Sequence, residues 1–117
     1  MGLWCGAKVP GVAMIDWERV AELRAEVGED GFAEVIALFL DETDEVTARL
    51  GAATGDLCRD LHFLKGSALN LGFRQLAQLC QEGERKCALG AQAEVDVSAL
   101  IQLYLNSKDA IARLPAA

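Results

Sequence analysis

The sequence predicts an all-α protein, an antiparallel four-helix bundle with a short extra N-terminal helix. Apolar residues recur at steps of three and four along most of the chain, which is the period of an amphipathic helix. Glycine, asparagine and aspartate interrupt that period, and the short links between the helical segments favour antiparallel neighbours. The chain has only 2 prolines and few β-branched residues, which argues against a sheet. Its 117 residues suffice for one domain with one core.

Two helices are expected in the N-terminal half. Residues 1–13 are predicted to be a flexible arm, and residues 14–117 a helical bundle domain. Asp16 is the expected N-cap of a short helix that ends at Gly28. Asp30 then caps a long helix with a near-heptad inward stripe. That stripe consists of Phe32, Ile36, Phe39, Thr43, Val46 and Leu50. The opposite face carries acids that are expected to be solvated rather than to bind a cation, namely Asp41, Glu42, Asp44 and Glu45.

Three more helices are expected in the C-terminal half. Asp56 caps the first of them, and Gly72 marks its break from the next helix. That next helix runs to about Leu89, a polar link follows, and Asp96 caps the last helix. The apolar stripe of the first of these helices consists of Leu57, Leu61, Leu64, Ala68 and Leu71. The second helix turns Leu76, Leu79, Cys80, Gly83 and Cys87 inward.

Charge and hydropathy exclude several classes of partner. The net charge of −7 makes nucleic acid and anionic membrane surfaces poor candidates. No apolar run approaches the roughly 20 residues that a membrane span needs. Residues 59–86 nevertheless carry five Lys or Arg against three Asp or Glu. This local excess is either chance or a patch that attracts an acidic partner pocket or a phosphoryl group, and the sequence leaves both open.

The four cysteines show no CxxC pair. Cys80 and Cys87 are seven residues apart, on one helix face, and are interpreted as small apolar core residues. We expect reduced thiols and a cytoplasmic protein. The cysteines are Cys5, Cys58, Cys80 and Cys87.

His62 is the only histidine of the chain. It follows Leu61 and therefore lies ~100° around the helix from the core stripe, which it flanks. Gly66, one turn later, removes a side chain where a partner would approach the imidazole, although glycine within a helix costs about 1 kcal/mol relative to alanine. Lys65 places a cation where it could neutralise an anion on the ring. A nucleophile, a bare patch and a cation together indicate phosphoryl chemistry at His62.

This stretch resembles the characteristic motif of histidine-containing phosphotransfer (HPt) domains. Six positions match at fixed spacing, in the string His62-x-Leu64-Lys65-Gly66-Ser67-x-x-x-x-Gly72. The resemblance extends from Asp16 to about Leu114. It implies a four-helix bundle whose histidine accepts a phosphoryl group on Nε2 as a phosphoramidate.

The resemblance also assigns roles to neighbouring residues. In the family, a polar residue of the following helix holds the second ring nitrogen, and Glu84 aligns there, with Gln81 one turn earlier. Lys65 would offset phosphoryl charge and Gly66 would give clearance. Ser67 could donate a hydrogen bond or simply pack, and Gly72 is expected to serve helix packing or the bend. Arg59, Leu69 and Glu84 are the expected partner-docking residues. Gly83 departs from the bulkier apolar residue usual in the family, which leaves the local register open.

The implied partners are response-regulator receiver domains, and a hybrid sensor kinase is a further candidate. The receiver would supply the aspartate and the Mg²⁺, so no cofactor is expected on this chain. No nucleotide-binding motif occurs, which predicts a phosphotransfer intermediate without autokinase activity. A free-standing monomer that shuttles between partners is expected, with no nucleic acid and no membrane involved.

Two other classes of function remain open at the level of sequence. A bundle that only binds a receiver or a kinase would keep the surface around His62 but would not need the imidazole. An enzyme, such as a phosphohistidine phosphatase or a dimeric kinase fragment, would need a further acid or base near His62. Asp60 and Glu84 are the only nearby acids.

Overall fold

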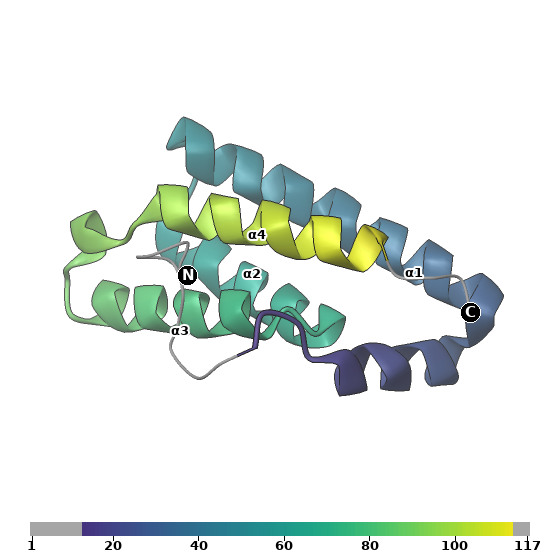
Figure 1. The fold of residues 1–117 in the computed structure, drawn as a ribbon. Coiled ribbons are helices and arrows are strands. Elements are labelled where there is room, and N and C mark those ends of the chain that lie inside the picture. The colour runs from purple at the N-terminus through teal and green to yellow at the C-terminus, as the bar shows by residue number, and fades with distance from the viewer. Residues whose placement is uncertain (1–12, 114–117) are drawn as a thin grey trace.

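The computed structural model describes residues 13–113, which form four α-helices and one short 3₁₀ helix, with no strand in that range. The elements are α1 Trp17–Ala52, α2 Leu57–Leu71, α3 Arg74–Ala88, η1 Gln92–Glu94 and α4 Val97–Ala112. α1 packs against α2 and α4, and α3 packs against the same two helices. The long part of α1 runs antiparallel to α4, and the four helices form a bundle (Figure 1). The predicted all-α fold and four-helix bundle are confirmed.

α1 is sharply bent at Gly28. This residue has φ 81° and ψ 165°, a conformation outside the helical region that glycine adopts without steric penalty. The part of α1 before Gly28 folds back along the bundle from the part that follows it (Figure 1). The short N-terminal helix that we predicted corresponds to the first arm of α1, which the non-helical conformation of Gly28 separates from the long arm. Asp30, the expected cap of the long helix, lies inside α1 because helical turns resume directly after the bend.

The three other helix starts at which an aspartate cap was predicted carry side-chain caps. The Asp16 carboxylate accepts from the backbone N–H of Arg19 at 3.1 Å. The Asp56 carboxylate accepts from the N–H of Cys58 at 3.1 Å, and Asp96 accepts from the N–H of Ala99 at 3.0 Å. Each cap satisfies an otherwise unpaired helix N–H and typically contributes about 1 kcal/mol. These local signals therefore fix where α1, α2 and α4 begin.

The turn between α2 and α3 docks onto the start of α1. Gly72 ends α2 in the left-handed conformation with φ 81°. Its carbonyl accepts from the N–H of Asp16 at 2.7 Å, and the Asp16 carboxylate pairs with Arg74 at 2.6 Å. A Cβ at Gly72 would lie 2.9 Å from the Asp16 carbonyl oxygen. Gly72 therefore serves the bend and close packing, the role that we expected for it.

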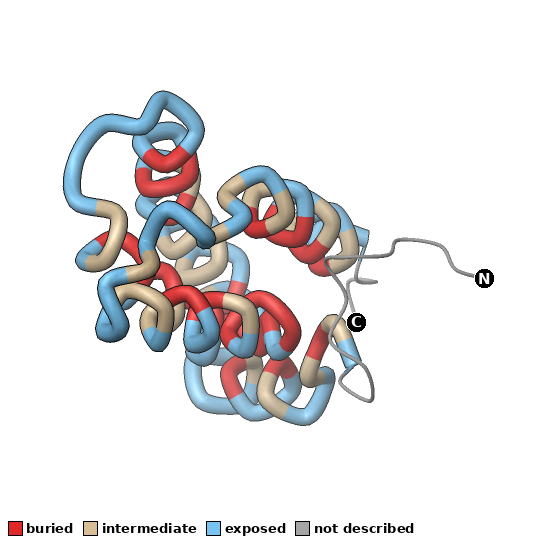
Figure 2. The backbone as a smooth tube through the Cα atoms, turned by 90° about the vertical axis from the view of Figure 1, so that its left-hand side faces the viewer, coloured by how far each residue is buried: buried red, intermediate tan, exposed pale blue. Residues whose placement is uncertain are grey.

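The helices turn their buried residues toward a shared interior (Figure 2). Four of the five predicted stripe residues of α2 are buried, and Leu57 at its start is half-buried. Complete burial of one such side chain contributes roughly 1.5–3 kcal/mol. The fully buried large residues around this stripe include Phe73, Leu76, Leu100, Leu103 and Tyr104. This core fixes the rotation of α2 about its axis, and so fixes which residues of α2 face solvent.

α3 approaches α2 closely at Gly83. This glycine is buried, and an added Cβ would lie 2.9 Å from Cδ1 of Leu61. The bulkier residue that the family resemblance implied would not fit unless Leu61 repacked or the helices moved apart. The predicted register of α3 is kept, with Leu76 and Cys80 buried on the same side. The polar link after α3 contains η1, which the sequence did not reveal.

None of the helices within residues 13–113 is long and apolar enough to cross a membrane.

Candidate functional site

His62 projects from α2 into solvent, with 77% of its side chain exposed. Leu61, directly before it, and Leu64, two residues after it, are fully buried and anchor the helix to the core. Since successive residues are ~100° apart around a helix, burial of Leu61 places His62 at the edge of the buried face. This is the position that the sequence predicted for the imidazole.

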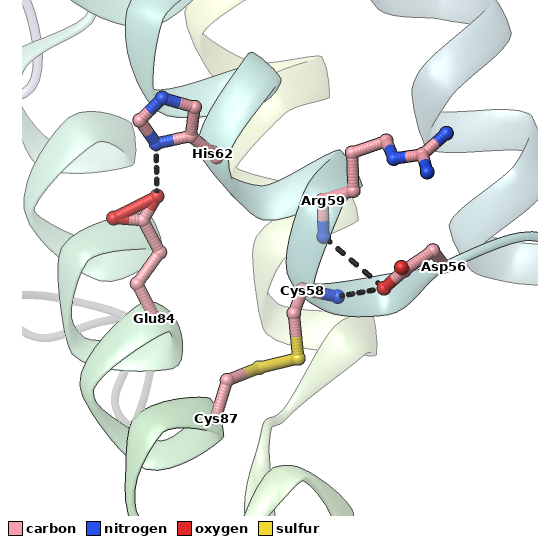
Figure 3. Close-up of a disulfide and its surroundings, with 6 residues drawn as sticks. All are labelled: Asp56, Cys58, Arg59, His62, Glu84 and Cys87. Carbon is pink, nitrogen blue, oxygen red and sulfur yellow. Dashed lines mark hydrogen bonds and ion pairs between the residues drawn. A yellow bond between two sulfur atoms is a disulfide. The ribbon is translucent and has the colours of Figure 1, made fainter.

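Glu84 of α3 contacts both His62 and Lys65. Its Oε2 lies 2.9 Å from Nδ1 of His62, and its Oε1 accepts from the Lys65 ammonium at 2.7 Å. The contact between the imidazole and the carboxylate crosses from α2 to α3 (Figure 3). The Glu84 and Lys65 side chains are 21% and 26% exposed, so this pair is largely shielded from solvent. One carboxylate thus holds the imidazole with one oxygen and a cation with the other.

The charge of Glu84 determines the tautomer of His62 in this contact. Burial raises the pKa of Glu84, but hydrogen bonds from Lys65 and His62 and the charges of these groups outweigh burial, so its pKa lies below the ordinary value. The ionised carboxylate can only accept hydrogen bonds, so Nδ1 carries the proton. Nε2 of the neutral ring then has a free lone pair, and it points away from Glu84 (Figure 3). The geometry leaves Nε2 as an exposed nucleophile.

Gly66 leaves an open patch one turn beyond His62. It is exposed, and a Cβ added to it would meet no other atom within 4 Å. This differs from Gly72 and Gly83, where an added Cβ would crowd a neighbour at 2.9 Å. The packing of residues 13–113 therefore does not require glycine at position 66, and nothing in that packing compensates for the helix-weakening effect of this glycine.

The surface beside His62 combines apolar and basic side chains. Leu69 is 58% exposed and Phe63 is 39% exposed, and Arg59 is also exposed. Phe63 was not among the residues singled out from the sequence, although its place directly after His62 and outside the apolar stripe was a usable signal. Exposed large apolar residues beside polar ones are typical of protein-binding surfaces.

A family model described as "Hpt domain" matches residues 34–117. The chain belongs to the Hpt domain family. Membership implies phosphotransfer in two-component signalling, and with it interaction with response-regulator receiver domains and kinases. The match begins within α1, after the bend at Gly28. Comparisons with curated proteins and with solved structures give no significant match.

Two other predicted site residues of this Hpt domain lie in different surroundings. Ser67 is buried at 5% exposure, so its side chain packs inside the bundle and does not share the surface with His62. Gln81, the alternative partner of the ring, is exposed, and the contact to Nδ1 is made by Glu84. Asp60, the other nearby acid, is buried and pairs with Arg49 of α1 at 2.9 Å.

The cysteines of this Hpt domain differ from expectation. Cys58 of α2 and Cys87 of α3 form a disulfide with a Cα–Cα distance of 6.0 Å (Figure 3). The expectation of reduced thiols is wrong for this pair, because packing of α2 on α3 brings together two residues 29 positions apart in sequence. Cys80 is free and buried, and burial raises the pKa of its thiol to about 12, with smaller effects of Glu84 and Lys65. Cys5 lies outside the described residues.

One carboxylate on the acidic face of α1 is engaged in contacts within the chain. The Asp44 carboxylate accepts from the Tyr104 hydroxyl at 2.6 Å and from the Lys108 ammonium at 2.9 Å. Asp41, Glu42 and Glu45 are exposed, as expected of a solvated face. Within residues 13–113, no group of three or more His, Cys, Asp or Glu side chains is placed to hold a metal ion.

Proposed function

We propose that this Hpt domain carries a phosphoryl group on Nε2 of His62, shuttling it between the aspartates of response-regulator receiver domains. The observation that supports this most directly is the Glu84 contact, which fixes the proton on Nδ1 and leaves Nε2 free. The exposure of the ring gives a receiver access to that nitrogen.

The transfer follows from this arrangement. The Nε2 lone pair attacks the phosphorus of an aspartyl phosphate in line with the bond to the leaving carboxylate oxygen. The P–N bond forms, the P–O bond breaks, and the carboxylate of the receiver leaves without needing a proton. The phosphorylated ring gains positive charge while Nδ1 keeps its proton. Glu84, already ionised and in contact, stabilises that charge without reorganisation. Glu84 is therefore a positioning residue, and the reverse reaction uses the same groups.

Lys65 has a different role in the site from that of Glu84. Its ammonium is bound to Glu84 at 2.7 Å, where it neutralises a carboxylate that would otherwise repel an incoming phosphoryl group. The Lys65 side chain is long and partly exposed, so it can also turn toward phosphoryl oxygens once they arrive.

The receiver docks on the surface around His62. Gly66 gives its backbone clearance, Leu69 and Phe63 supply apolar contact, and Arg59 supplies positive charge. The receiver brings the aspartate and the Mg²⁺ for the reaction, and a hybrid sensor kinase is a second partner. In this proposal the domain is monomeric and cytoplasmic, and it does not phosphorylate itself from ATP.

The decisive experiment is transfer from a ³²P-labelled receiver domain to the wild-type chain and to His62→Gln. We expect an acid-labile, alkali-stable label on the wild type only, because a phosphoramidate is cleaved by acid and the glutamine amide is not a nucleophile. Binding of both proteins to the receiver is measured in parallel. Intact binding without label on either chain would contradict the carrier role and leave a docking protein.

A further inference from the structure

The disulfide lies one helical turn from the phosphoryl-accepting site on both helices that build it. Cys58 precedes His62 by four residues on α2, and Cys87 follows Glu84 by three residues on α3. Residues three or four apart on a helix are neighbours on its surface. The cross-link and the His62–Glu84 contact therefore bridge the same two helices side by side (Figure 3).

The second half of α3, which presents Glu84, has few other anchors. Beyond Cys80 the only buried residue of α3 is Gly83, which has no side chain to pack. A pocket of about 340 Å³ opens beside this half of the helix, between Leu79 and Gly83 of α3 and Val95 and Leu100 beyond it. Apart from the close approach of Gly83 to Leu61 and the bond from Lys65 to Glu84, the covalent tie at Cys87 is what holds this half of α3 against α2.

The three described cysteines differ in accessibility. Cys58 and Cys87 are half-buried, so the cross-link lies near the surface of the bundle. Cys80 is fully buried, and its raised pKa keeps it in the unreactive thiol form. Among the described cysteines, reaction with a dissolved oxidant or reductant is therefore directed to the Cys58–Cys87 pair.

We propose that the Cys58–Cys87 pair is a reversible redox site that controls how firmly Glu84 holds His62, and through it the rate of phosphoryl transfer. This proposal rests on the carrier function proposed above. The oxidised form ties α3 to α2 and keeps Glu84 on Nδ1, so that His62 accepts the phosphoryl group faster. The reduced form lets the second half of α3 move away from α2, and Nδ1 loses its partner for part of the time.

The redox step is thiol–disulfide exchange with a small disulfide such as oxidised glutathione. One cysteine thiolate attacks the small disulfide and releases one small thiol, which takes up the proton. The second cysteine thiolate then attacks the protein sulfur of the mixed disulfide and releases the second small thiol. The protein pair loses two electrons and two protons, and the small disulfide gains them. In a compartment rich in reduced thiols such a disulfide is transient, as in a redox sensor.

The test compares the full chain oxidised with oxidised glutathione and reduced with dithiothreitol. Intact mass and thiol labelling report the disulfide. The ¹⁵N and ¹H resonances of the His62 ring report the Nδ1 contact without any phosphotransfer. Transfer from a phosphorylated receiver gives the rate. We expect the oxidised form to retain a protected Nδ1 proton and to accept the phosphoryl group at least about fivefold faster, the lower end of typical coupling between linked sites.

Matched variants identify the cysteines responsible. Cys58→Ser and Cys87→Ser should each behave as the reduced wild type under both conditions. Cys5→Ser and Cys80→Ala should keep the redox response. Failure of the disulfide to form, or identical ring spectra and rates in the two redox states, would overturn the proposal. If no form accepts phosphate, the carrier function itself fails, and the ring spectra still decide whether the cross-link controls the Glu84 contact.

Discussion

At the scale of single residues, Glu84 determines which nitrogen of His62 is free to react. Glu84→Gln removes the negative charge that stabilises the phosphorylated ring but keeps an oxygen that can accept from Nδ1. Since hydrogen bonds to charged groups contribute about 1.5–3 kcal/mol, we expect phosphoryl transfer to slow by roughly tenfold to a hundredfold. Rapid-quench kinetics with a phosphorylated receiver measure this rate.

The control for that substitution is Glu82→Gln. Glu82 is exposed, lies on the same helix and pairs with Arg85 at 2.6 Å. The substitution changes the net charge of α3 equally but does not touch the imidazole. Equal slowing in both variants would show that the charge of the surface matters and that the contact to Nδ1 does not.

The depressed pKa of Glu84 also predicts a pH dependence of stability. The unfolded chain takes up a proton on this carboxyl near its ordinary value of 4.5, whereas the folded chain resists protonation to lower pH. Stability from Glu84 is therefore complete above about pH 4.5 and is lost as the pH falls through the lower, folded-state pKa. Urea unfolding of the wild type and Glu84→Gln should differ at pH 7 and converge in acid. A constant difference between the two across this range would contradict the prediction.

At Gly66, one substitution should change stability and phosphoryl transfer in opposite directions. Gly66→Ala should raise the free energy of unfolding by about 0.5–1 kcal/mol, because alanine favours the helix and the added Cβ meets no neighbour. Transfer from the receiver should nevertheless slow, since the side chain intrudes on the docking surface. Thermal unfolding and transfer kinetics on the same preparation test both effects. Unchanged transfer in Gly66→Ala would argue against a clearance role.

At the scale of whole helices, the close contact of α2 with α3 makes both stability and phosphoryl transfer sensitive to substitution at Gly83. Gly83→Ala would place a methyl group 2.9 Å from Leu61, so the two helices must separate or Leu61 must repack. Overpacking of this kind typically costs 1–3 kcal/mol. We expect lower stability in urea unfolding together with slower phosphoryl transfer, because the shift carries Glu84 away from His62. Leu61→Val in the same chain should restore part of both, and absence of rescue would show that the loss does not arise at this contact.

The helices also show which features local sequence can predict. The caps at Asp16, Asp56 and Asp96 act within three residues of themselves, and the apolar period of α2 alone places His62 at the helix edge. These features need no knowledge of distant residues. The break at Gly28 was visible as a glycine, but the direction in which the first arm folds back was not, because that depends on how this arm docks at Gly72.

Some features depend on the packing of the whole molecule. They could not be predicted from local sequence, or could be predicted only through the family resemblance. Glu84 meets His62 only because α3 packs on α2 in one register, and the resemblance supplied that pairing. The family resemblance did not predict the Cys58–Cys87 disulfide, and the spacing of these two cysteines in the sequence matches no motif. Burial of Ser67 likewise follows from the rotation of α2 in the complete bundle.

The disulfide predicts a property of the whole molecule that is independent of its effect on transfer. It joins residues 29 positions apart, and closing a loop of that size in the unfolded chain favours folding by roughly 3–4 kcal/mol in the chain-entropy model. Reduction, or Cys58→Ser, should lower the free energy of unfolding by about that amount, measured by urea titration with and without dithiothreitol. Cys58→Ser should respond to dithiothreitol no further. Stability of the wild type that does not change on complete reduction would mean that α3 is held by packing alone and would contradict the prediction.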